Sequence, residues 1–204
     1  PYRFWADIDR TLPRRAIKIY GPPTTSGTRD AFHELCMEKV TAEMQEYPKP
    51  YAKVRQDGLW VDSGENDNLI VQKLTQDPNA FGVFGFSFLE ENRDKILGAA
   101  IEGVDPKFET ISSGDYPLSR SLFFYIKVDH LRSIPELYEY VKLFMDEKMI
   151  GKGGHLTRIG LVPLPDNLRK ASRERVLNLV PLTLENGELS TLEAFANQKD
   201  LVKK

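Results

Sequence analysis

The sequence has few of the features that mark specialised classes of protein. Of its 204 residues one is a cysteine, Cys36, so no disulfide can form within the chain. The net charge of -2 provides no positive excess for nucleic acid or for an anionic membrane surface. No apolar run is long enough to span a bilayer. We therefore expect no nucleic-acid partner and no direct insertion into a membrane.

The usual signatures of catalysis are also scarce. His33, His130 and His155 lie far apart and have no companion at the spacing of a metal site. The hydroxyl-rich stretch 24–28 is no nucleotide P-loop, because no lysine follows its glycine, and no base lies near Ser26 in the sequence. The sequence therefore predicts no metal, no cofactor and no catalytic residues.

The most informative feature that is present is the loop GPPTTSGTRDAF at residues 21–32. Alternating residues 17–20 predict a strand before it, and apolar residues at positions 32, 35, 36 and 40 predict a helix after it. This helix is expected from Thr28 to about Glu46, because two prolines follow. A helix start with hydroxyls and a guanidinium nearby is a socket for an anion. A simple helix cap by Ser26 or Thr25 is the alternative.

Other segments predict a protein of alternating strands and helices. Residues 51–62 indicate a hairpin or irregular strand, and the apolar run 81–88 contains two glycines that allow close approach of a neighbour. Further strands are expected at 97–104 and 121–128, the second buried on both faces because residues 122–126 are continuously apolar. Helices are expected from Leu69, from Pro135 to Gly151, from Asp166 through Leu179, and from Thr191 to about Val202. This pattern predicts the α/β class.

Residues 5–165 resemble the substrate-binding proteins of bacterial phosphate ABC transporters, which are periplasmic binding proteins of the two-lobed type II class. The resemblance is carried, in order, by residues 17–32 (IKIYGPPTTSGTRDAF), 60–74 (WVDSGENDNLIVQKL), 79–91 (NAFGVFGFSFLEE) and 116–127 (YPLSRSLFFYIK), and more weakly by 153–165 (GGHLTRIGLVPLP). It implies a type II periplasmic-binding-protein-like fold with one nearly complete lobe and the C-terminal part of the other.

The resemblance also implies a division of the chain. Residues 1–114 are expected to form most of lobe two, and residues 115–204 to return through a hinge at 112–117 to lobe one. Because the resemblance begins inside the family pattern, we expect a C-terminal fragment that lacks the N-terminal section. Such a fragment is expected to bind phosphate weakly and to associate through the exposed edge of strand 121–128.

The function implied by the resemblance is reversible capture of inorganic phosphate in the periplasm and its delivery to the permease subunits of the transporter, without enzymatic activity. Ser26, Gly27, Thr28 and Arg29 are expected at the anion, and Thr25 and Asp67 are secondary candidates. Some family members carry an arginine before the serine, where this chain has prolines, so the guanidinium role is given to Arg29. For Asp67, a loop that caps the next helix is the alternative.

A second functional class stays open at this point. An enzyme or sensor could hold a phosphorylated ligand, or another tetrahedral oxyanion, at the same loop. Such an enzyme needs a base or a metal cluster, and the sequence shows neither. The acceptor that distinguishes phosphate from sulfate by its proton is expected in the section missing from this chain.

Overall fold

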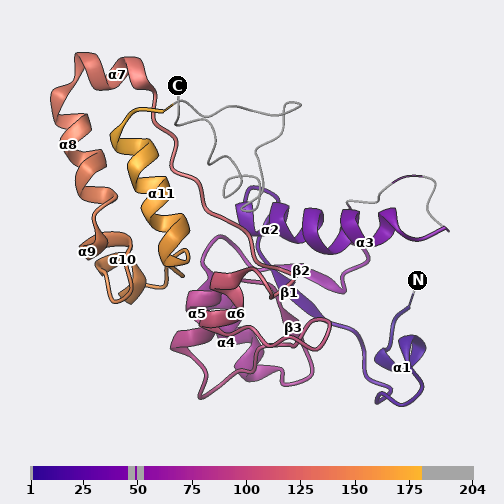
Figure 1. The fold of residues 1–204 in the computed structure, drawn as a ribbon. Helices are drawn as coiled ribbons and strands as arrows, with labels where there is room; N and C mark the ends of the chain where they lie inside the picture. The colour runs from indigo at the N-terminus through magenta and orange to yellow at the C-terminus, as the bar shows by residue number, and fades with distance from the viewer. Residues whose placement is uncertain (1, 46–48, 50–52, 181–204) are drawn as a thin grey trace. The chain divides into compact units, whose positions relative to one another are not determined.

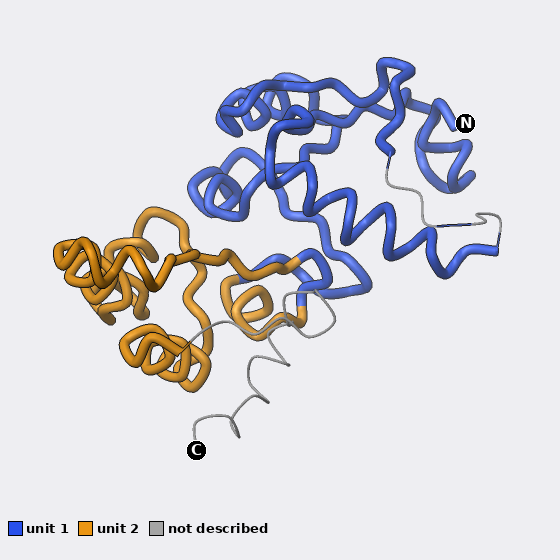
Figure 2. The backbone as a smooth tube through the Cα atoms, turned by 90° about the horizontal axis from the view of Figure 1, so that it is seen from above, with its two compact units in different colours: residues 1–107, 116–118 blue, residues 108–115, 119–204 orange. Residues whose placement is uncertain are grey.

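In the computed structural model the first half of the chain combines strands with helices, and the described residues of the second half form helices joined by loops (Figure 1). The structure describes residues 2–45, 49 and 53–180. The chain divides into two compact units (Figure 2): residues 1–107 with 116–118 form unit 1, and residues 108–115 with 119–204 form unit 2. The prediction of an α/β fold is confirmed. The assignment of residues 1–114 and 115–204 to two lobes stays a prediction.

Unit 1 is built around a parallel sheet with the strand order β2-β1-β3. Its strands are β1 (Ile19–Gly21), β2 (Trp60–Asp62) and β3 (Phe81–Gly82). Ile19 of the central strand lies opposite both Trp60 and Phe81. Parallel neighbours cannot be joined by a tight turn, and helices occupy both connections. The predicted strand 17–20 is therefore present and is shifted by about two residues.

Helices of unit 1 alternate with these strands: α1 (Trp5–Ile8), α2 (Gly27–Phe32), the π-helix η1 (His33–Glu38), α3 (Lys39–Ala42), α4 (Asp67–Gln76) and α5 (Phe86–Glu91). The backbone stays helical from α2 through η1 to α3, so residues 27–42 form one continuous helical segment. The predicted helix 28–46 is thus confirmed with an earlier end. Its predicted apolar stripe is only half-buried: the Cys36 thiol is partly exposed, and Val40 is exposed.

The core of unit 1 lies between the sheet and α4. Ile70 of α4 is completely buried, and Val71 and Tyr20 are buried with it. A Cβ at Gly82 would lie 2.6 Å from Leu74 Cδ1 and 3.0 Å from Ile70 Cγ2, so only glycine allows α4 to pack this closely on β3. The predicted close approach at a glycine of the run 81–88 is found at this position.

Unit 2 is helical in its described residues: α6 (Phe108–Ser113), α7 (Val128–Ser133), α8 (Pro135–Phe144), α9 (Glu147–Ile150), α10 (His155–Arg158) and α11 (Asp166–Leu177). Leu131, Val141 and Met145 form its buried apolar centre. Arg169 is also buried and donates to Glu147 at 2.9 Å and to the Leu164 carbonyl at 2.8 Å, which ties α11 to α9. The predicted helix starts at Pro135 and Asp166 are confirmed.

Two predicted strands are wrong. Residues 97–104 contain an isolated bridge between Ile101 and Val104, which closes a turn. Residues 121–127 form no strand, and α7 begins at Val128. An apolar run becomes a buried strand only when neighbouring strands satisfy its backbone groups, and the described residues supply no such neighbour to this run. Its side chains are consequently exposed, Leu122 by 76%.

Two smaller expectations are modified or lie outside the structure. The helix predicted at 135–151 is interrupted after Phe144, because Asp146 caps a new helix by accepting the Lys148 N–H at 2.9 Å. Gly151 then ends α9 as predicted. The stretch 51–62 contributes β2 at its end, and the predicted helix 191–202 lies outside the described residues.

Candidate functional site

Three loops of unit 1 meet at one edge of its sheet. Because β1, β2 and β3 are parallel, their carboxyl ends at Gly21, Asp62 and Gly82 lie at the same edge. Each of these strands is followed by a loop and then by the start of a helix, namely α2, α4 or α5. In open parallel sheets this edge is where ligands bind. The loop that carries the sequence motif therefore opens into a location suited to a binding site.

Ser26 caps the helical segment that follows β1. Its backbone is extended, and its Oγ accepts the Thr28 N–H at 3.2 Å, while its carbonyl accepts the Asp30 N–H at 3.2 Å. The capping interpretation of the sequence is thus correct as geometry. It does not exclude the anion site, because a Ser26 hydroxyl that accepts the Thr28 N–H still has its own O–H to donate to a ligand. Within the described part of the chain, the Thr28 hydroxyl has no hydrogen-bond partner.

Arg29 fixes the start of this helix to the end of β2. It is buried, and its Nη1 donates to Asp62 Oδ1 at 2.8 Å and to the Pro22 carbonyl at 3.0 Å. Its Nε donates to His33 Nε2 at 2.9 Å. Asp62, and not the neighbouring Asp30, is therefore the acid that binds this guanidinium.

Trp60 forms a flat support for the guanidinium of Arg29. The guanidinium carbon of Arg29 lies 4.5 Å from the centre of the indole, a distance typical of a cation–π contact. The indole Nε1–H donates to the same Asp62 oxygen at 2.8 Å. Gly21 is required on the other strand, because a Cβ there would lie 2.0 Å from Trp60 Cζ2. The end of β2 thus contacts Arg29 twice: the Trp60 ring packs against the face of the guanidinium, and Asp62 accepts a hydrogen bond from its edge.

These contacts leave one nitrogen of Arg29 available. Nε uses its single N–H and Nη1 uses both of its N–H groups, whereas Nη2 has no hydrogen-bond partner in the described residues. The Asp62 carboxylate that balances the charge is about half exposed, with a side-chain exposure of 53%. The arrangement is a clamped guanidinium with two unused donors.

The other two loops are joined to this region by acidic side chains. The Thr25 hydroxyl donates to Glu65, and Asp67 Oδ2 accepts the Gly85 N–H at 3.0 Å. Partial burial raises the pKa of Asp67, and the charge of Glu65 raises it further, while the Gly85 N–H acts against both. Asn66, rather than Asp67, caps α4 by accepting the Asn68 N–H at 3.0 Å.

The structure places the predicted residues at the starts of α2 and α4 and adds contacts with other residues. Ser26, Gly27, Thr28 and Arg29 form the first turn and its cap. Thr25 is hydrogen-bonded to Glu65, which lies in the loop before α4, and Asp67 is the first residue of α4. Sequence reasoning missed His33, Trp60, Asp62 and Glu65. For His33 a signal existed, because it follows Arg29 by four positions on a helix. For Trp60 and Asp62 the signal was weaker, since alternate residues of a strand share a face.

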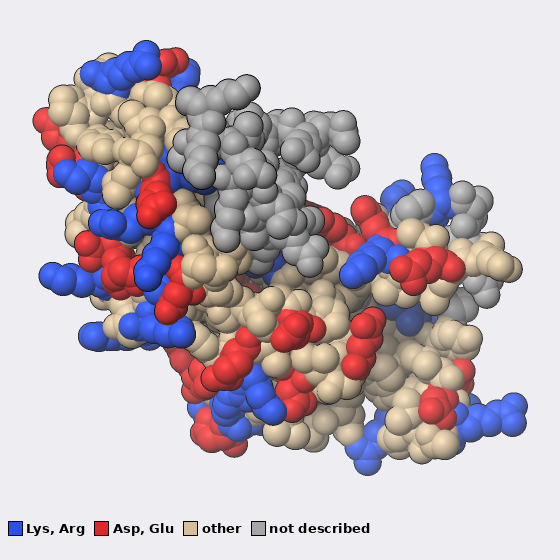
Figure 3. All heavy atoms as spheres, in the orientation of Figure 1, with Lys and Arg blue, Asp and Glu red and all other residues tan. Residues whose placement is uncertain are grey.

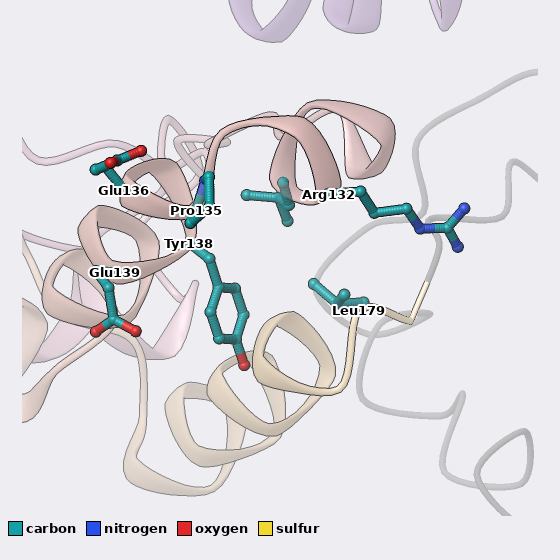
Figure 4. A pocket seen from close by; sticks show the side chains of 7 residues that line it. Arg132, Pro135, Glu136, Tyr138, Glu139 and Leu179 are labelled. Carbon is teal, nitrogen blue, oxygen red and sulfur yellow. The ribbon is translucent and has the colours of Figure 1, made fainter.

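Neither the charges on the face drawn in Figure 3 nor the hollow in Figure 4 marks the candidate site. Acidic and basic side chains are interspersed on the face drawn in Figure 3. The hollow in Figure 4 lies in unit 2 and is lined by Leu131, Arg132, Pro135, Glu136, Tyr138, Glu139 and Leu179. It contains none of the predicted residues. We place the candidate site by its donors, because a small anion needs convergent polar groups rather than a large apolar volume.

Within the described residues there is neither a candidate membrane span nor a candidate metal cluster. None of their helices is long and apolar enough to cross a membrane. Their His, Cys, Asp and Glu side chains form no group of three that could hold a metal ion. Because residues 181–204 are not among those described, the expected absence of a metal site in the whole chain stays a prediction.

Comparison with known proteins identifies the superfamily to which the chain belongs. The sequence model described as "PBP superfamily domain" matches residues 3–148, which is more than half of the chain. The chain belongs to this superfamily. Among solved structures, "a possible phosphate binding protein from Planctomyces limnophilus DSM 3776" is 26% identical to this PBP domain, with a TM-score of 0.60, and the match covers 88% of this chain and 60% of the other.

Two curated relatives of this PBP domain illustrate the match. "Phosphate-binding protein PstS" of Staphylococcus haemolyticus is 28% identical over 149 residues, which are 71% of this chain and 42% of the relative. "Protein SphX" of a Synechocystis species is 28% identical over 205 residues, 97% of this chain and 52% of the relative. The chain thus spans about half the length of the curated relatives it matches.

Proposed function

We propose that this chain is part of a substrate-binding protein for inorganic phosphate and that the anion binds at Ser26, Gly27, Thr28 and Arg29. The observation that carries the proposal is the first turn of α2, where the Thr28 hydroxyl and Arg29 Nη2 have no partner among the described residues. Relatives named phosphate-binding proteins support phosphate as the ligand.

The chemistry of the site suits a tetrahedral anion. Backbone N–H groups at the start of residues 27–42 carry the positive end of the helix dipole. Hydroxyls of Ser26 and Thr28 donate to two phosphate oxygens, and Nη2 of Arg29 donates to a third. Asp62 balances part of the guanidinium charge, so the anion is held by directed donors and leaves again readily.

The wider role follows from the same proposal. The protein captures phosphate reversibly in the periplasm and delivers it to the permease subunits of an ABC transporter. It acts as a receptor and not as an enzyme. Incubation with phosphomonoesters separates the two: a receptor retains phosphate in stoichiometric amounts, whereas steady release of phosphate from the ester favours an enzyme that uses the same loop.

Two threonine-to-valine variants, Thr28→Val in the predicted site and Thr75→Val as its control, test the site directly. Thr28→Val keeps the shape of the side chain and removes its hydroxyl. An unpaired anion oxygen costs about 1–3 kcal/mol, so affinity should fall by about 5- to 150-fold. The measurement is a titration of the isotope-labelled 204-residue chain with inorganic phosphate, followed by the amide signals of Gly27 and Thr28 in NMR spectra. This readout detects millimolar as well as tight binding.

Thr75→Val is the matched control. It makes the same chemical change in α4, where the Thr75 hydroxyl donates to the Gln72 carbonyl, and we expect an unchanged phosphate titration. Equal affinities of wild type and Thr28→Val would remove the motif from the site. A wild-type chain whose Gly27 and Thr28 signals do not respond to phosphate would contradict the proposed function.

A further inference from the structure

His33 contacts Arg29, one of the residues of the predicted anion site. It is the first residue of η1, four positions after Arg29, and its Nε2 accepts the Nε–H of Arg29 at 2.9 Å. An imidazole nitrogen that accepts a hydrogen bond carries no proton, so His33 is neutral and its proton is on Nδ1. Neither the motifs of the sequence nor the family match assigns a role to this residue.

We infer that His33 is a positioning residue of the anion site, which it serves by holding the guanidinium of Arg29 in one plane. The inference rests on the proposed function. A guanidinium is planar and its donors point in fixed directions. His33 holds Nε, while Asp62 and the Pro22 carbonyl hold Nη1, so the direction of the unused Nη2 is determined.

Protonation of His33 removes this restraint. A protonated Nε2 can no longer accept from Arg29, and two positive groups then face each other at hydrogen-bond distance. Arg29, Asp30 and Glu38 are the charged groups that act on the imidazole. Partial burial lowers the pKa of His33, Arg29 lowers it further, and the two carboxylates act in the opposite direction.

The lowered pKa of His33 determines how pH affects its contact with Arg29. The folded state favours neutral His33, so the contact is complete above the ordinary histidine value of about 6.5 and is lost as pH falls through the lowered pKa of His33. At low pH, Arg29 therefore loses the hydrogen bond from its Nε to His33 and keeps those made by Nη1. Phosphate binding weakens with this loss, beyond any change caused by protonation of phosphate itself.

The experiment uses Trp60 as the reporter, because its indole lies under Arg29. The chain contains two tryptophans, and Trp5→Phe leaves Trp60 as the sole source of indole fluorescence. In this background we expect one fluorescence transition between pH 8 and pH 5, with its midpoint below that of an ordinary histidine. His33→Gln, whose amide oxygen accepts at every pH, should abolish the transition and keep the fluorescence of the neutral state.

Phosphate titrations at pH 8 and pH 5.5 complete the test. Protonation of phosphate affects wild type and His33→Gln equally, so wild type should lose additional affinity between pH 8 and pH 5.5. Because the pKa of His33 lies below the ordinary value of about 6.5, this additional loss should stay below about tenfold. A fluorescence transition that persists in His33→Gln, or equal losses of affinity in both proteins, would overturn the role of His33. Failure of wild type to bind phosphate at pH 8 would instead overturn the proposed function, and with it the inference.

Discussion

In unit 1 the apolar side chains of α4 pack against the sheet, and Ile70 is fully buried beside β3. In unit 2 the apolar residues 122–126 form a segment without regular secondary structure that is largely exposed. Both stretches have the composition of a buried element. They differ in backbone partners: the unit 1 strands pair with each other, and the described residues offer no pairing strand to 122–126. Hydrophobicity alone therefore does not bury a segment whose backbone groups stay unpaired.

Side-chain contacts partly compensate in unit 2. The ring of Phe124 stacks on Phe144 of α8 with 4.5 Å between ring centres, and Tyr140 lies nearby at 6.3 Å. Aromatic pairs of this kind contribute about 0.5–1.5 kcal/mol beyond the area that they bury. They attach the segment to α8 without covering it, since Leu122 and Tyr125 stay mostly exposed.

The largest expected effect tests this contrast in stability. Ile70→Ala removes a fully buried side chain and should lower the free energy of unfolding by about 2–5 kcal/mol. Leu122→Ala removes an exposed one and should change it by no more than about 0.5 kcal/mol. Urea denaturation of the two variants measures both values. A loss at Leu122 as large as that at Ile70 would show that the run is covered in solution, as the expected self-association requires.

A smaller effect compares two helix caps, Ser26 in unit 1 and Asp146 in unit 2. Each side chain accepts a backbone N–H two residues later, so replacement by alanine should cost about 1 kcal/mol of stability in either case. Only Ser26→Ala should also weaken phosphate binding in the NMR titration. Ser26→Gly sharpens the comparison, because glycine is a tolerable cap and the hydroxyl is still lost. Phosphate affinities that are equal in Ser26→Ala and Asp146→Ala would reduce Ser26 to a cap.

The smallest expected effect is on the pH dependence of stability, to which Asp67 in unit 1 and Asp166 in unit 2 contribute with opposite signs. The pKa of Asp67 is raised by burial, so its favourable contribution is present below the ordinary aspartate value of about 3.9 and is lost as pH rises through the raised pKa. The pKa of Asp166 is lowered chiefly by the hydrogen bond from Arg169, so its contribution is present above that value and is lost as pH falls through the lowered pKa.

The asparagine variants of these two residues show the difference. Relative to wild type, Asp67→Asn should gain stability as pH is raised from 3 to 7, and Asp166→Asn should lose stability over the same change. Thermal unfolding midpoints at both pH values provide the measurement. If both variants shift in the same direction, the burial of Asp67 or the contact of Asp166 with Arg169 does not persist in solution.

Several elements were predictable because their signals are local. Ser26 caps a helix as its residue type suggests, Pro135 begins α8, and α11 begins at Asp166. The strand before the motif and the α/β class followed from short-range periodicity. The strands at 97–104 and 121–128 were wrong because the same local signal does not say whether a neighbouring strand is available.

By itself, the sequence determined where hydroxyls, glycine and arginine meet a helix start, since those residues are consecutive from Ser26 to Arg29. Only the tertiary structure decided how Arg29 is used. Its acid partner Asp62 is 33 positions away, and it reaches Arg29 because β2 lies beside β1 in the sheet. The physical reason is that a helix cap depends on bonds within one turn, whereas the partner of a buried charge depends on which strand packs against that turn.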